Sequence, residues 1–134
     1  MNVRHAMTTA LIAVTPHHSA ASAVQRLCAW DVSGLPVVDN DRHILGVLTE
    51  LDLLRALRAG ANLDEVPVGA VMSQRPLFVE PETPLETAAD LLEEWRVRRL
   101  PVCERGRLVG IISRGDVLRA MAAVPCTDVA VATG

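Results

Sequence analysis

The feature that most constrains this chain is an internal duplication. When the sequence is shifted against itself by 65 residues, Val3 aligns with Val68 and Leu35 with Leu100; a shorter turn in the second copy reduces the later offset to 64. A repeat of this length indicates a fold built from two similar units. Because a unit of about 60 residues buries too little surface to be very stable alone, the two units are expected to pack face to face.

Each copy predicts the element order β-α-β-β-α. Short apolar runs bounded by turn residues predict the strands, and capping residues followed by helical spacing predict the helices. The first copy has predicted strands at 11–14, 35–38 and 44–48 and predicted helices at 19–31 and 49–59. The second copy has predicted strands at 77–79, 100–103 and 108–112 and predicted helices at 84–96 and 113–123.

The expected fold class is α+β, with two β-α-β-β-α repeats packed around a pseudo-twofold axis. The predicted parts are a first repeat at residues 1–60, a linker at 61–67, a second repeat at 68–124 and a C-terminal tail at 125–134. Packing of this kind would place the junction between the last strand and the last helix of each repeat symmetrically at a cleft.

That junction carries a hydroxyl and a carboxylate three residues apart in both copies, Thr49 with Asp52 and Ser113 with Asp116. On the first turn of a helix, these groups lie beside unpaired backbone N–H groups and the positive end of the helix dipole. Such a place can hold a phosphorylated ligand. The alternative is a capping box, in which the same side chains bind the helix's own N–H groups, and the two roles can coexist.

Composition excludes several classes of protein. The net charge is −3, Tyr is absent and there is one Phe, whereas nucleic-acid binders usually carry excess basic residues or stacking aromatics. The three cysteines, Cys28, Cys103 and Cys126, form no C-x-x-C pair, which argues against a metal or disulfide framework. No apolar run approaches the roughly 20 residues that span a bilayer. We therefore expect a cytoplasmic protein that binds neither nucleic acid nor membrane.

Four motifs occur in order and carry a family resemblance. They are V-x-x-V-M at 68–72, V-x-P at 79–81, L-P-V at 35–37 and 100–102, and G-h-h-[ST]-x-x-D (h is apolar) at 46–52 and 110–116. Residues 1 to about 123 thereby resemble a tandem pair of CBS domains, the Bateman module. The resemblance implies a regulatory module that binds AMP, ADP, ATP, S-adenosylmethionine or a dinucleotide in the cleft between repeats. It also implies a disc-like homodimer.

The resemblance further implies which residues contact the nucleotide. They are, in chain order, Thr15, Val32, Ser33, Val47, Thr49, Asp52, Arg98, Arg99, Ile111, Ser113 and Asp116. The cleft at Asp116 would combine Thr15, Val32 and Ser33 with Arg98, Arg99, Ile111, Ser113 and Asp116. The cleft at Asp52 would combine Glu80, Val97 and Arg98 with Ser33, Gly34, Val47 and Thr49. A carboxylate at these positions can accept both hydrogens of a ribose diol.

The two clefts are expected to differ. The set at Asp52 has fewer cations and has Glu80 where the other has a hydroxyl, so the cleft at Asp116 is predicted to be the better nucleotide site. The alternative for Arg98 and Arg99 is a solvated helix end, where cations interact favourably with the dipole.

Other residues are given structural roles. Trp30 and Trp95 fall on the apolar faces of their helices and are predicted to be core residues, and Met7 and Met72 are predicted to fill the seam between repeats. The histidines show no metal-site spacing.

The sequence therefore predicts a stand-alone regulatory module with no required cofactor, no metal and an unidentified protein partner. The main alternative is a ligand-free dimerisation protein that regulates a partner. Catalysis is not expected, because the chain has none of the motifs G-x-x-x-x-G-K-[ST], G-x-G-x-x-G, G-x-S-x-G and H-E-x-x-H. The two aspartates also belong to separate junctions and need not form an acid/base pair.

Overall fold

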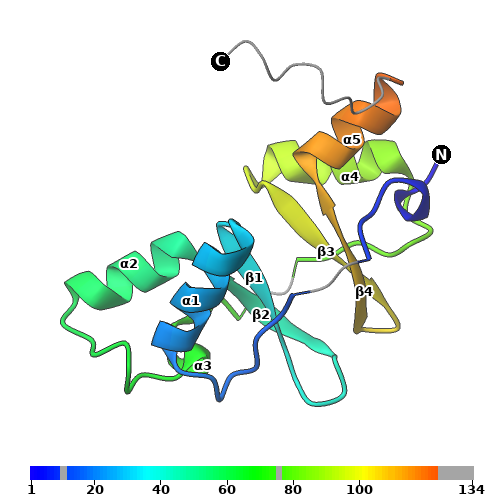
Figure 1. The fold of residues 1–134 in the computed structure, drawn as a ribbon. Coiled ribbons are helices and arrows are strands. Elements are labelled where there is room, and N and C mark those ends of the chain that lie inside the picture. The colour runs from blue at the N-terminus through cyan, green and yellow to red at the C-terminus, as the bar shows by residue number, and fades with distance from the viewer. Residues whose placement is uncertain (10–11, 75–76, 124–134) are drawn as a thin grey trace, which may run out of the picture.

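The computed structural model describes residues 1–9, 12–74 and 77–123 (Figure 1). The expected α+β class and the duplication are confirmed, although the predicted first strand of each repeat is not among the strands of the structure. The elements are η1 (Val3–His5), α1 (Ala20–Trp30), β1 (Gly34–Val38), β2 (Ile44–Thr49), α2 (Glu50–Arg58), α3 (Val68–Val71), α4 (Leu85–Glu94), β3 (Arg99–Glu104), β4 (Arg107–Ser113) and α5 (Arg114–Met121). The predicted tail at 125–134, Leu11 and Cys126 lie outside the described residues.

Each repeat is built on an antiparallel hairpin, β1–β2 or β3–β4. The predicted first strand of each repeat is reduced to one parallel bridge, Val14 with Val37 and Val79 with Val102. The residue after each bridge turns away at once, because its N–H donates to a side chain three residues on. Thr15 N donates to His18 Nδ1 at 2.9 Å, and Glu80 N donates to Thr83 Oγ1 at 3.0 Å.

Helices cover one face of each hairpin and bury its apolar side chains. Figure 1 shows α1 and α2 with β1–β2 in one half and α4 and α5 with β3–β4 in the other. Leu35 and Leu48 are fully buried in the first core, and Leu100 and Ile112 are fully buried in the second. A smaller cluster of Val38, Cys103 and Leu108 joins the two hairpins.

The two repeats exchange their first segments. Val3 belongs to the core of the second repeat, where its N–H donates to Thr83 O at 2.9 Å. Val68 belongs to the core of the first repeat, where its N–H donates to His18 O at 2.8 Å. Figure 1 accordingly shows η1 beside the half that contains α4, and α3 beside α1. The predicted boundaries at 1–60 and 68–124 follow the duplication, but each buried core also contains a residue from the other repeat.

The same exchange adds a single bridge to the outer side of each hairpin. Thr8 pairs with Ile111 of β4, and Ser73 pairs with Val47 of β2. Both partners in each pair donate an N–H to the other's carbonyl, at 2.8 to 3.1 Å. These four hydrogen bonds tie each repeat to the chain segment that opens the other repeat in the sequence.

The prediction that Trp30 and Trp95 are core residues is wrong. Their exposed fractions are 60% and 53%. Each tryptophan lies at the very end of its helix, where the chain turns through a left-handed residue, Asp31 or Arg96. Helical spacing places each indole on the apolar side, but the helix ends there and leaves the side chain in the open.

In the described part of the chain, no helix combines the length and the apolar character that crossing a membrane requires.

Met7 and Met72 are half-buried and pack against the cores of the second and first repeat, respectively.

Candidate functional site

The two strand-to-helix junctions are capping boxes. Thr49 Oγ1 accepts from the N–H of Asp52 at 3.2 Å, and Asp52 Oδ2 accepts from the N–H of Thr49 at 2.9 Å. Ser113 and Asp116 repeat this pair of bonds at 3.1 and 2.9 Å. The capping alternative is thus confirmed at both junctions. Each aspartate uses only Oδ2 for capping, so Oδ1 remains for another donor.

The remaining oxygen has a different environment in the two copies. Asp116 Oδ1 accepts from Arg119 Nη2 at 2.8 Å, and the Asp116 side chain is only 12% exposed. Among the described residues, Asp52 forms no ion pair, although Arg55 occupies the position equivalent to Arg119. The carboxylate of the second junction is therefore already paired with a cation.

A small cleft of about 250 Å³ lies at the second junction. It is lined by Thr8, Ile12, Val32, Gly34, Leu35, Pro36, Arg99, Ile111, Ser113 and Asp116. Five of the predicted contact residues are brought together here: Val32, Arg99, Ile111, Ser113 and Asp116. Both repeats contribute to the cleft, as expected.

A large cleft of about 720 Å³ lies at the first junction. It is lined by Ser33, Gly34, Leu35, Pro36, Val47, Thr49, Glu50, Leu51, Ser73, Leu77, Trp95, Arg96, Val97, Arg98, Arg99, Leu100, Pro101 and Ile111. Eight residues predicted for the two clefts meet here: Ser33, Gly34, Val47, Thr49, Val97, Arg98, Arg99 and Ile111. Trp95 and Arg96 were not predicted, although they directly precede the predicted Val97 and Arg98 in the chain.

Thr15 and Asp52 line neither of these two clefts, and the structure gives each a local role. Thr15 is held in the turn by His18, and Asp52 caps α2. Glu80, predicted at the Asp52 cleft, is also absent from the residues that line the two clefts.

The expectation that the cleft at Asp52 has fewer cations is wrong. Arg96, Arg98 and Arg99 all line the large cleft, whereas Arg99 alone of these lines the small one. Arg98, predicted at the Asp116 cleft, is absent from the residues that line the small cleft. The distribution of cations therefore does not favour the cleft at Asp116 as the nucleotide site.

Arg99 carries an unsatisfied donor. Its Nε is buried and has no hydrogen-bond partner among the residues that the structure describes. A buried N–H without an acceptor costs about 1–3 kcal/mol. Arg99 also lines both clefts, so its guanidinium offers a positive charge to an anionic ligand in either.

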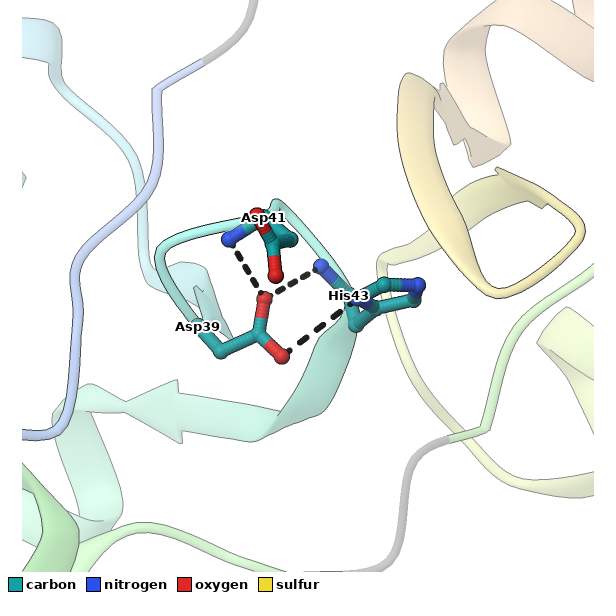
Figure 2. A group of neighbouring side chains, drawn as sticks. All are labelled: Asp39, Asp41 and His43. Carbon is teal, nitrogen blue, oxygen red and sulfur yellow. Dashed lines mark hydrogen bonds and ion pairs between the residues drawn. The ribbon is translucent and has the colours of Figure 1, made fainter.

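A second polar group lies at the tip of the first hairpin, where Asp39, Asp41 and His43 come together (Figure 2). Asp39 Oδ1 accepts from the backbone N–H groups of His43 and Asp41, both at 2.9 Å, and Oδ2 lies 3.4 Å from His43 Nδ1. The bond from the His43 backbone is the main cause that lowers the pKa of Asp39. This grouping was not predicted from the sequence. It forms because the turn between β1 and β2 brings the three residues together.

His18 links the start of α1 to the preceding turn. Its Nδ1 accepts from the N–H of Thr15 at 2.9 Å, and its Nε2 lies 3.5 Å from Arg26 Nη2. Burial lowers the pKa of His18, and the charges of Arg26 and His17 lower it further. The folded protein thus favours the neutral imidazole.

We expect His18→Asn to weaken the pH dependence of stability. The folded-state pKa of His18 lies below its ordinary value of 6.5, so the unfolded chain takes up a proton first as the pH falls through 6.5. The contribution of His18 to the free energy of unfolding is therefore complete above pH 6.5 and declines below it. The slope of this decline is at most about 1.4 kcal/mol per pH unit, the value for one proton. Asn keeps an oxygen that can accept from Thr15 N. Urea unfolding of both proteins between pH 7.5 and 5.5 measures the slopes, and equal slopes would contradict this role.

Comparison with known proteins agrees with the geometry. A family model described as CBS domain matches residues 3–59 and 68–123. The CBS domain-containing protein YhcV of Bacillus subtilis is 31% identical over 116 residues, which cover 87% of this chain and 82% of that protein.

Two solved structures are similar over nearly the whole chain. CBSX2 from Arabidopsis thaliana, crystallised in complex with AMP, superposes with a TM-score of 0.79 at 38% identity, covering 92% of this chain and 97% of that one. Hypoxic Response Protein I, crystallised with two coordinated zinc ions, superposes with a TM-score of 0.81 at 28% identity, covering 89% and 98%. A protein of that name occurs in Mycobacterium tuberculosis.

Proposed function

The chain belongs to the CBS domain family, and we propose that it is a regulatory module that binds an adenosine nucleotide between its two repeats without catalysing a reaction. The observation that carries this proposal is the pair of clefts that both repeats line, with the arginine Arg99 in the walls of both. The AMP complex of CBSX2, at 38% identity, supports adenosine nucleotides as the ligand class.

The residues that line the clefts offer the chemistry that such a ligand needs. Arg98 and Arg99 line the large cleft and would pair with phosphates, since a guanidinium can bind phosphate oxygens through two parallel N–H groups. Apolar contact with adenine would come from Val32, Val47 and Ile111, and hydrogen bonds to ribose or phosphate from Ser33, Thr49, Ser113 and Asp116. AMP, ADP, ATP and S-adenosylmethionine all share the adenosine part of this scheme.

Regulation would follow from the position of the clefts. A ligand held by residues of both repeats favours the relative orientation of the repeats that it binds best, and a partner protein can respond to that orientation. The size of the response is limited by the difference in ligand affinity between the two arrangements. The module is proposed to act in this way in the cytoplasm on a protein that the sequence does not identify.

A homodimer is part of the proposal. Exposed apolar side chains occupy equivalent helices of the two repeats, namely Leu51, Leu54 and Leu57 on α2 and Leu118 and Met121 on α5. Large apolar side chains that gather on an exposed helix are typical of interaction surfaces. The same surface favours the second candidate function, a dimerisation protein whose clefts stay empty. Light scattering of the purified protein measures the oligomeric state.

A ligand screen tests the nucleotide proposal. AMP, ADP, ATP or S-adenosylmethionine at 100 times its Kd should raise the free energy of unfolding by about 2.7 kcal/mol. Arg99→Gln should weaken binding about tenfold or more in whichever cleft is used, whereas Arg58→Gln, an exposed arginine on α2, should not. Thermal unfolding and calorimetric titration measure both effects. If none of these compounds shifts the transition, the ligand-free dimerisation role is favoured instead.

A further inference from the structure

The two clefts differ in size, charge and aromatic content, and these differences bear on the identity of the ligand. Resting on the proposed function, we infer that each chain binds one nucleotide, in the large cleft, that this nucleotide carries two or more phosphates, and that the indole of Trp95 contacts it. Three independent observations support the assignment.

The first observation is volume. Pockets that hold small ligands usually measure about 300–1,000 Å³. The large cleft, at about 720 Å³, falls within this range, and the small cleft, at about 250 Å³, falls below it. The large cleft can therefore enclose a complete nucleotide as the structure stands, whereas the small cleft would first have to open.

The second observation is charge. Arg96, Arg98 and Arg99 line the large cleft with one acidic residue, Glu50, whereas Arg99 and Asp116 offset each other in the small one. A cleft with an excess of arginines favours several phosphates and disfavours the positively charged sulfonium of S-adenosylmethionine.

The duplication shows that this charge is specific to one repeat. The positions equivalent to Arg96, Arg98 and Arg99 in the first copy are Asp31, Ser33 and Gly34. The wall of the large cleft that comes from the second repeat is thus basic, while the equivalent segment of the first repeat has no cation and gives the small cleft only Val32 and Gly34. At the small cleft, the carboxylate of Asp116 is also engaged by Arg119 at 2.8 Å.

The third observation is Trp95, which lines the large cleft while 53% of its surface stays exposed. Its counterpart Trp30 is not among the described residues that line the small cleft. An exposed indole beside arginines presents a flat apolar face on which a base can stack, with Arg96 and Arg98 following it along the chain. Trp95 would therefore both strengthen binding and report on it.

Calorimetric titration of the whole chain with ATP, ADP, AMP, adenosine and S-adenosylmethionine tests the ligand class. We expect one site per chain, and affinity that increases with the number of phosphates and decreases as salt is added. The double variant Arg96→Gln, Arg98→Gln should weaken ATP binding about tenfold or more and leave adenosine binding unchanged. The double variant Arg55→Gln, Arg58→Gln makes the same change in net charge at exposed positions on α2 and should change neither.

Tryptophan fluorescence tests the location, because the chain has only two tryptophans. ATP should change the emission of Trp30→Phe, which retains Trp95, and leave that of Trp95→Phe unchanged. Trp95→Phe should also weaken ATP binding measurably, while Trp30→Phe should not.

This inference would be overturned by two equal sites, by a preference for S-adenosylmethionine, or by an ATP affinity that the Arg96 and Arg98 substitutions leave unchanged. In each of these cases the proposed function would still stand. Absence of binding by all five compounds would overturn the proposed function itself. Circular dichroism of each variant verifies that it is folded before the affinities are compared.

Discussion

Gly46→Ala is expected to lower the free energy of unfolding by about 2–4 kcal/mol. A Cβ at Gly46 would fall well inside van der Waals distance of the carbonyl oxygen of Ser73, which is a backbone atom and cannot rotate away. Relief of the clash requires β2 and the segment at Ser73 to separate. The two hydrogen bonds between Val47 and Ser73, at 3.1 and 2.9 Å, would then be lost.

Gly110→Ala is the matched control at the equivalent position of the other repeat. Its Cβ would lie 2.9 Å from Met7 Sδ and 3.1 Å from Thr8 O, and the flexible Met7 side chain can move. The loss of stability should therefore be smaller than at Gly46. Urea unfolding of the three proteins measures the difference, and a loss at Gly110 equal to that at Gly46 would argue against the close backbone approach at Ser73.

Val3→Asp is expected to cost about 3 kcal/mol or more and to disrupt the second repeat, although Val3 lies at the start of the first copy in the sequence. Val3 is fully buried among Leu85, Leu100 and Ile112, where a carboxylate would find an apolar environment. Hydrogen exchange should show that amides of β3 and β4 lose protection first. Thr9→Asp places the same charge at an exposed position six residues further on and should have little effect.

The mirror substitution sharpens this test. Val68→Asp introduces a carboxylate into the core that contains Leu35 and Leu48, so the amides of β1 and β2 should lose protection first. If each substitution instead affected the repeat that contains it in the sequence, the exchange of first segments would be wrong.

Local features were predicted well because their causes lie within a few residues. The spacing of Thr49 and Asp52 specifies a capping box, and the structure forms it with both hydrogen bonds. Ser19 caps α1, as predicted, by accepting from the N–H of Ser22 at 3.1 Å. Short apolar runs and turn residues likewise located both hairpins to within a residue or two.

Burial of the tryptophans was predicted wrongly for a physical reason. Helical periodicity states the side of the helix on which Trp30 and Trp95 lie, but not how far the sheet extends beneath that end. The left-handed residues Asp31 and Arg96 end the helices where the hairpin offers no further cover. A cleft at the first junction was expected, but its charge was predicted wrongly in the same way, because its basic wall depends on where the segment of residues 95–99 runs relative to the first repeat.

By itself, the sequence determined the duplication, the order of the elements, the caps and turns, and the family of this protein. These follow from interactions between residues close together in the chain, and the duplication presents each of them twice. Only the tertiary structure decided that Val3 and Val68 enter each other's repeat, that Arg96 and Arg98 face the larger cleft, and that Asp116 is already paired with Arg119. These outcomes depend on how distant segments pack together, and two nearly equivalent repeats offer local patterns that do not distinguish one packing partner from the other.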